Sequence, residues 1–190
     1  LHLCNKNMVK MDTNNNDGKA KHKLLAEVCY AAKEEGDLIK THYTLYQQKY
    51  GDSDSQLCTV LARSFADIGD IVRGRDLYGG GGRRKAELQD NLKKIFKEIY
   101  DKLDGKNGAK QYYKDENGGN FFKLREDWWE ANRQEIWKAI TCNDDKKLAS
   151  AHYFRPTCID GRGGAQATKQ CRCDGDQVPT YFDYVPQYLR

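Results

Sequence analysis

The sequence predicts an all-α fold: a bundle of about four or five helices followed by a loop held together by disulfides. Apolar residues recur at helical spacing in several long stretches, and no sustained alternation of apolar and polar residues indicates a strand. Four of the seven cysteines lie within residues 142 to 173 among Gly, Asp and Pro, which is typical of a cross-linked loop.

The composition describes one domain with long solvent-exposed faces. The chain has 190 residues, 32% of them charged, with a mean hydropathy of −0.91. It contains no apolar run of about 18 residues. The opening stretch "LHLCNKNMVK" lacks the hydrophobic region of a signal peptide. We therefore expect neither a membrane span nor an export signal within these residues.

Two helices are expected first, over residues 21–35 and 38–50. One face of the first carries Leu24, Leu25, Val28, Cys29 and Ala32. The second has apolar and aromatic positions at Leu38, Ile39, His42, Tyr43, Tyr46 and Tyr50. Gly36 is expected to stop or kink the helical run between them.

The third helix precedes the glycine-rich stretch "DIGDIVRGRDLYGGGG". Its apolar stripe is Leu57, Leu61, Phe65, Ile68 and Val72, with Cys58 on the buried side and the polar "DSDS" before it as a source of N-cap oxygens. A nucleotide-binding loop needs a preceding strand, a Lys and a hydroxyl, whereas this chain has a helix, Arg75 and Asp76. Gly74 and the run from Gly79 to Gly82 therefore indicate a helix end and a connector.

The fourth and last helices flank a polar insertion. The fourth has the clearest stripe of the sequence, Leu88, Leu92, Ile95, Ile99 and Leu103, and ends at Asp104 and Gly105. Residues 106–119 are expected to be an exposed insertion. The last helix, residues 120–140, places Phe121, Trp128, Asn132, Ile136 and Ala139 on one side. We expect at least one of Trp128 and Trp129 to fill the core.

The sequence argues against an enzyme and against a cofactor. Glu126 and Asp127 are adjacent on a helix and point apart, so they cannot act as an acid/base pair. No Ser/His/Asp or Cys/His order is present, and the four histidines are isolated.

The cysteines favour disulfides over a metal site. Zinc sites favour pairs separated by two residues, and the only close pair here, Cys171 and Cys173, is separated by one. Because the count is odd, one cysteine is expected to have its partner outside these residues, and Cys4 is the natural candidate.

A cluster of cations on the fourth helix is the candidate binding site. It comprises Arg83, Arg84, Lys85, Lys93, Lys94 and Lys97, with Arg73 and Arg75 across the glycine stretch. Such a cluster could bind a sulfated glycan or another polyanion. The alternative is an ordinary solvated face, because Asp90/Lys94, Lys97/Asp101 and Glu98/Lys102 are spaced as i,i+4 pairs. With a net charge of only +4, the sequence favours this alternative.

Several long blocks resemble a known family. In order they are "LARSFADIGDIVRGRDLY", "NLKKIFKEIY", "LREDWWEANRQEIWKAITC", "CRC" and "VPTYFDYVPQYLR". Together they resemble the Duffy-binding-like (DBL) domains of the erythrocyte membrane protein 1 variant antigens of malaria parasites. The blocks "LHLC" and "LLAEVCYAAKEEGDLI" further resemble the alpha class of these domains.

The resemblance implies an organisation and a disulfide pattern. Residues 1–18 would end a preceding subdomain and its linker, 19–180 would form the middle helical subdomain, and 181–190 would open the next. Three disulfides are expected among the six cysteines other than Cys4. The resemblance makes Cys58–Cys158 the most probable pair and leaves the pairing of Cys29, Cys142, Cys171 and Cys173 open.

The resemblance also implies a host-receptor adhesion module on the outer face of the infected erythrocyte, anchored by a transmembrane segment outside these residues. Its variable loops, including residues 104–119, would serve antigenic variation and meet antibodies. The alpha class is linked with rosetting through heparan-sulfate-like glycans, blood-group sugars or complement receptor 1. Four cysteines between "ARSFADIGD" and "DYVPQ" mark the commoner subtype, which argues against rosetting.

Two alternatives to adhesion by this chain remain. Within the family, it could be a scaffold segment whose receptor contacts lie in neighbouring subdomains. Outside the family, an intracellular nucleic-acid-binding bundle is disfavoured, because reducing conditions would leave the cysteine-rich loop without its cross-links.

Overall fold

The structure is a computed structural model that describes residues 4, 6–11, 19–50, 54–77, 82–103, 108–115, 118–142, 146–159, 164–175 and 177–190, with only the backbone described for 45–50, 54 and 55. The helices are α1 (Lys6–Val9), α2 (Ala20–Tyr50), α3 (Asp54–Arg73), α4 (Arg83–Asp101), α5 (Ala109–Tyr112) and α6 (Phe122–Ile140), followed by the 3-10 turns η2 (Phe182–Tyr184) and η3 (Gln187–Leu189). Over these ranges, β structure is limited to two isolated bridges in the loop after α6. The predicted all-α class is confirmed.

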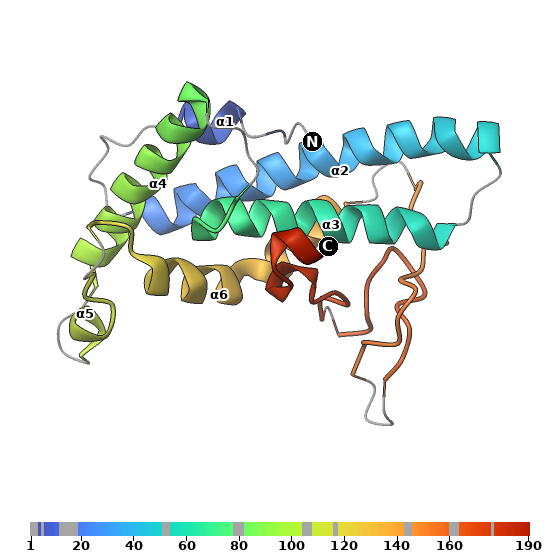
Figure 1. Cartoon of the computed structure of the whole chain (residues 1–190). Coiled ribbons are helices and arrows are strands. Elements are labelled where there is room, and N and C mark those ends of the chain that lie inside the picture. The colour runs from blue at the N-terminus through green and yellow to red at the C-terminus, as the bar shows by residue number, and fades with distance from the viewer. Residues whose placement is uncertain are drawn as a thin grey trace.

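Three long helices form the body of the bundle. Helices α2, α3 and α6 lie lengthwise against one another, and α4 crosses one end of them (Figure 1). Helices α2 and α6 run in the same direction and contact each other, and α3 runs antiparallel to both (Figure 1). The loop from α6 to η2, residues 141–181, is called the cysteine loop below. It leaves the other end of the bundle and returns the chain to α3 (Figure 1).

The expectation that Gly36 stops or kinks the first helical run is wrong as to the stop, because α2 is one helix of 31 residues. A glycine is needed at position 36 because α2 and α6 cross there. A Cβ at Gly36 would lie 2.1 Å from the backbone oxygen of Ile140 at the end of α6. Glycine therefore lets the two helices approach more closely than any side chain would allow.

The stripes predicted for α3, α4 and α6 are buried, except that Leu103, which follows the end of α4, and Ala139 are half-buried. The fully or almost fully buried positions include Leu57, Cys58, Leu61, Phe65, Ile68, Val72, Leu88, Leu92, Ile95, Phe96, Ile99, Trp128 and Ile136. Helix α3 ends at Arg73, and Gly74 follows with φ 75°, so the predicted glycine stop is confirmed. The capping residues Asp52 and Ser53 and the connector glycines 79–81 lie outside the described residues.

Aromatic side chains fill the centre of the bundle. Trp128 and Trp129 are both buried, as is Trp137, so neither of the adjacent tryptophans offers a surface platform. The Phe65 ring lies 5.0 Å from that of Trp129 and 5.2 Å from that of Trp137 between ring centroids. These ring contacts join α3 to α6, the two helices against which the C-terminal segment, residues 182–190, is held.

The insertion is only partly described. Within it, α5 is a single turn whose residues are exposed or half-buried, in line with the expected surface position. The C-terminal segment forms only the 3-10 turns η2 and η3. No helix in the described part of the chain is long and apolar enough to span a bilayer.

We predict that Gly36→Ala destabilises the fold. In an open helix this change would stabilise by about 1 kcal/mol. Here the added methyl meets the Ile140 backbone, so we expect a loss of about 1–3 kcal/mol in the free energy of unfolding, measured by urea denaturation. Gly82→Ala is the control, because nothing lies near its Cβ position, and its effect should stay below about 1 kcal/mol. A more stable Gly36→Ala variant would contradict the crossing.

Candidate functional site

The cation cluster divides into free and paired members. Arg83, Arg84 and Lys94 are exposed on α4, Lys93 is half-buried, and none of the four has an ion pair within the described residues. These four residues are called the α4 basic face. Arg83 and Arg84 lie in the first turn, which contains no acidic residue and follows Gly82 without a side-chain cap. Because that end of a helix is already positive, the arrangement concentrates positive potential there.

Lys85 and Lys97 differ from the other four because they are neutralised locally. The Lys85 ammonium lies 3.2 Å from the carboxylate of Asp76 and donates to the Asp76 carbonyl at 3.0 Å. Lys97 lies 2.7 Å from Asp101, one of the predicted i,i+4 pairs. The series Lys85, Lys93 and Lys97 therefore does not present three free charges on one flank, although an exposed pair such as Lys97–Asp101 could still exchange partners.

Arg73 and Arg75 do not belong to a polyanion site, contrary to the sequence expectation. Arg73 is buried in the last turn of α3, where it bonds the Asp70 carboxylate at 3.1 Å and the Gly69 carbonyl at 3.0 Å. Arg75 bonds Glu126 on α6 at 2.7 Å. Burial lowers the pKa of Arg73, while the carboxylates of Glu126 and Asp183 act in the opposite direction. Arg73 is thus buried and unavailable to a ligand, whereas the Arg75 side chain is 56% exposed but is neutralised by Glu126.

Their partners belong to a larger cluster that fixes the C-terminal segment, called the charge network below. It contains the carboxylates of Asp67, Asp70, Glu126 and Asp183 and the guanidinium groups of Arg73, Arg75, Arg133 and Arg190. Four negative and four positive groups leave no net charge. The network therefore serves the fold and has no excess charge with which to attract a polyanion.

Asp183 is the carboxylate of the charge network that is contributed by η2 and bonded to α6. Its carboxylate accepts hydrogen bonds from both the Nε (3.0 Å) and the Nη2 (2.8 Å) of Arg133 and from Trp129 Nε1 (2.9 Å), while its carbonyl accepts one from Arg73. The side chain is completely buried. Sequence reasoning missed this role, although Asp183 lies in "YFDYVPQ", part of a block that carried the family resemblance.

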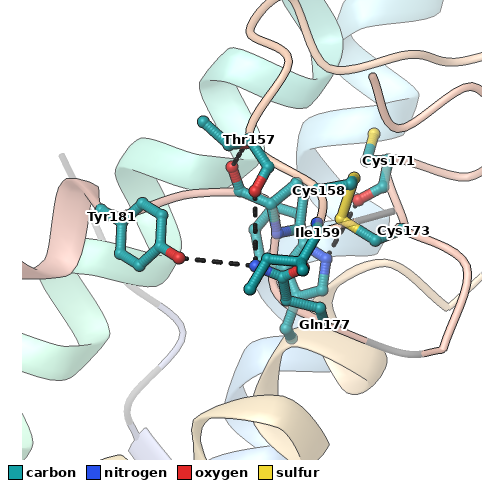
Figure 2. The surroundings of a disulfide bond; sticks show 9 residues. Thr157, Cys158, Ile159, Cys171, Cys173, Gln177 and Tyr181 are labelled. Atoms are coloured by element: carbon teal, nitrogen blue, oxygen red, sulfur yellow. Dashed lines mark hydrogen bonds between the residues drawn. A yellow bond between two sulfur atoms is a disulfide. The ribbon is translucent and has the colours of Figure 1, made fainter. Parts of the chain in front are cut away.

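The disulfides differ from the expected pattern. Cys58 is bonded to Cys171 and Cys158 to Cys173, so the expected pair Cys58–Cys158 is wrong. Cys171 has φ 54°, and this left-handed residue separates the directions of the two thiols in the C-x-C pair. Cys171 is thereby joined to Cys58 on α3, and Cys173 is joined to Cys158 within the cysteine loop. Figure 2 shows the disulfide between Cys158 and Cys173.

The expected third disulfide is absent: Cys29 and Cys142 are free thiols, as is Cys4. The Cys142 carbonyl accepts a hydrogen bond from Lys40, and Cys29 lies 11 residues before Lys40 on α2. That separation is about 16 Å along a helix axis. A disulfide needs Cα atoms within about 7 Å. Burial, with Glu135 nearby, raises the pKa of Cys29 to about 11, which keeps its thiol protonated.

The carboxylates that were rejected as an acid/base pair have separate structural partners. Glu126 holds Arg75, and Asp127 accepts a hydrogen bond from the Tyr113 hydroxyl at 2.8 Å. Over the described ranges no group of His, Cys, Asp and Glu side chains could hold a metal ion. The surviving candidate site is thus the α4 basic face, an exposed cationic surface on a rigid helix.

A sequence model described as the Duffy binding domain matches residues 1–190. The chain belongs to the Duffy binding domain family. It is 27% identical over 144 residues to the Duffy receptor beta form of Plasmodium knowlesi, a match that covers 75% of this chain and 10% of that protein.

Two solved Duffy-binding-like domains have the same fold. The NTS-DBL1(alpha-1) domain of Plasmodium falciparum membrane protein 1 (PfEMP1) from the varO strain is 38% identical, with a TM-score of 0.76. The match covers 99% of this chain and 40% of that one. The ICAM-1-binding PfEMP1 IT4var13 DBLbeta domain is 34% identical, with a TM-score of 0.70, covering 100% and 39%. The chain thus spans about two fifths of the length of these two solved domains.

We predict that Asp183→Asn strongly destabilises the chain. It removes one charge from a buried cluster and leaves Arg133 without its counter-ion, so we expect a loss of about 3–5 kcal/mol in the free energy of unfolding. Asp101→Asn is the matched control, because it breaks the exposed i,i+4 pair with Lys97 and should cost no more than about 0.5 kcal/mol. Urea denaturation followed by circular dichroism measures both, and equal losses would argue against a central role for Asp183.

We also predict the covalent pattern. Mass mapping of a non-reduced digest should give Cys58–Cys171 and Cys158–Cys173. Cys29 should be alkylated slowly in the native state, because its thiol is half-buried and protonated, and quickly after unfolding. A Cys29–Cys142 or Cys58–Cys158 peptide in folded material would contradict the structure.

Proposed function

We propose that this chain is part of a host-receptor adhesion module and contacts its receptor through the α4 basic face. Family membership over the whole chain supports the adhesion role. So do the names of its relatives, among them a Duffy receptor and a PfEMP1 DBLbeta domain solved bound to ICAM-1. The observation that carries the proposal is that four cations of helix α4 have no ion pair within the described residues, whereas Arg73 and Arg75 are paired with carboxylates of the chain.

The proposed setting is the outer face of the infected erythrocyte, with an anchor outside these residues. Residues 1–18 would close a preceding subdomain, 19–180 would form the middle subdomain, and 181–190 would begin the next. The exposed α5 region, within the expected variable insertion, would carry antigenic variation and face antibodies.

The ligand class that fits the α4 basic face is a sulfated glycan of the heparan-sulfate type. Guanidinium groups bind sulfate oxygens through paired N–H donors, and a repeating polyanion can contact several cations at once. Neutral blood-group sugars would gain little from these charges. Complement receptor 1 would have to offer an acidic surface, and rosetting would follow if either ligand lies on uninfected erythrocytes.

A second candidate function is that of a scaffold whose receptor contacts lie elsewhere in the protein. The charge network favours it, because six of its eight charged side chains help to hold residues 183 and 190 against α3 and α6. A heparin test on the α4 basic face separates the two functions.

We predict that reversing Arg83, Arg84 and Lys94 to Glu weakens heparin retention. Each contact contributes at most about 1 kcal/mol at an exposed site, so three changes together are needed for a clear effect. Wild-type retention should itself fall steeply between about 0.1 M and 1 M salt, as the Debye length falls from about 10 Å to about 3 Å. The readout is the salt concentration of elution from a heparin column.

The control reverses Lys146, Lys147 and Lys169 to Glu, three exposed cations of the cysteine loop. It changes the net charge by the same amount at a different place. If both triple variants elute at the same salt concentration, retention reflects net charge alone. The α4 basic face would then be only a solvated surface, and the scaffold function would be favoured.

A further inference from the structure

A pocket of about 340 Å³ opens where α3, the cysteine loop and the C-terminal segment meet. Arg63 comes from α3, Tyr153, Arg155 and Tyr181 from the cysteine loop, and Leu189 and Arg190 from the C-terminal segment. Its volume is at the lower end of ligand pockets, which span about 300–1,000 Å³. It is large enough for one or two side chains of a partner.

The lining of the pocket is strongly positive. It contains three arginines and no carboxylate. Arg190 is held by Asp67 and Asp70 on α3. Arg63 and Arg155 are exposed, and neither has an ion pair within the described residues, although Arg63 lies one turn from Asp67. Arg63 and Arg155 therefore line the pocket without an ion-pair partner among the described residues, the Arg155 guanidinium lying 5.1 Å from the centre of the Phe154 ring. A guanidinium keeps its charge at any physiological pH.

The rest of the wall is apolar or already hydrogen-bonded. Phe182 and Leu189 contribute apolar surface. The Tyr153 hydroxyl donates to Thr180 Oγ1 at 3.2 Å, and the Thr157 hydroxyl donates to the Pro179 carbonyl. Few acceptors remain for a hydroxyl-rich ligand, whose groups would lose water without replacement partners. The wall suits a carboxylate beside an apolar side chain better than a saccharide.

The pocket is also preorganised. Figure 2 shows Gln177 lying between Thr157 and Tyr181, beside the Cys158–Cys173 disulfide. The Gln177 amide nitrogen donates to the Thr157 carbonyl at 3.3 Å and to the Tyr181 hydroxyl at 3.4 Å, and its oxygen accepts from the Ile159 N–H at 2.8 Å. Such a cross-linked wall loses little conformational freedom when a ligand binds.

We propose that this pocket binds an acidic peptide segment of a partner protein. An Asp or Glu carboxylate lies between Arg63 and Arg155, and a neighbouring apolar side chain packs against Phe182 and Leu189. The site is separate from the α4 basic face and does not depend on whether that surface binds a polyanion.

The test uses the intact polypeptide that contains this chain and an end-blocked, fluorescein-labelled peptide Gly-Leu-Glu-Phe-Gly, with fluorescence polarisation as readout. We expect saturable binding that weakens at least about tenfold when Glu is replaced by Gln in the peptide, because a charge-assisted pair is lost. Arg63→Gln and Arg155→Gln should each weaken binding to a similar extent. Arg84→Gln, on the α4 basic face, is the control and should leave peptide binding within twofold.

Three outcomes overturn the proposal. One is the absence of saturable binding at peptide concentrations up to about 1 mM. Another is equal competition by N-acetylneuraminic acid or inorganic sulfate, which would make the pocket a general anion or sugar site. The third is protection of Arg63 and Arg155 from phenylglyoxal in the intact polypeptide but not in the 190-residue chain, which would show that another part of the same polypeptide fills the pocket.

Discussion

The fold depends on the burial of one carboxylate. Asp183 accepts hydrogen bonds from Trp129 and twice from Arg133, so its charge is compensated and its oxygens are satisfied away from water. These bonds join the C-terminal segment to α6, and the Asp183 carbonyl joins it to Arg73 on α3. A buried charge is tolerated only when it is paired in this way. Removing one partner would therefore affect three parts of the chain at once.

The charge network also determines which surfaces remain available. It neutralises Arg73, Arg75, Arg133 and Arg190 and leaves the cations of α4 facing solvent. By fixing the C-terminal segment against α3, it also places Tyr181 and Leu189 beside Arg63. The pocket thus depends on these ion pairs, and one of their members, Arg190, is part of its wall.

Apolar periodicity was sufficient to predict α3, α4 and α6, because their stripes are unbroken and the packing follows the stripe. It failed at Gly36, since a glycine at a helix crossing and a glycine at a helix end look alike without the partner helix. The prediction of a cation cluster failed for Arg73 and Arg75. They lie near the other cations in sequence but are paired with Glu126, which is distant in sequence.

The pairing of cysteines and the convergence of Arg63 with Arg155 lie beyond sequence reasoning for a similar reason. Cys58 and Cys171 are separated by 113 residues, and the direction of each thiol depends on local backbone geometry such as the left-handed Cys171. Arg63 and Arg155 are isolated cations in sequence. Only the return of the cysteine loop to α3 brings them to one pocket.

The parallel course of α2 and α6, with the C-terminal segment docked on α3, has a consequence for how the chain folds. The contacts that close the bundle join residues far apart, such as Lys40 with Cys142 and Arg73 with Asp183. Contacts of such high sequence separation slow folding, because chain entropy is lost before they form. During synthesis, Arg73 has no Asp183 carbonyl to bond until the stretch around residue 183 has left the ribosome. The bundle therefore closes only after residues 40, 73, 142 and 183 have all emerged, and the disulfide that joins Cys58 to Cys171 has the same requirement.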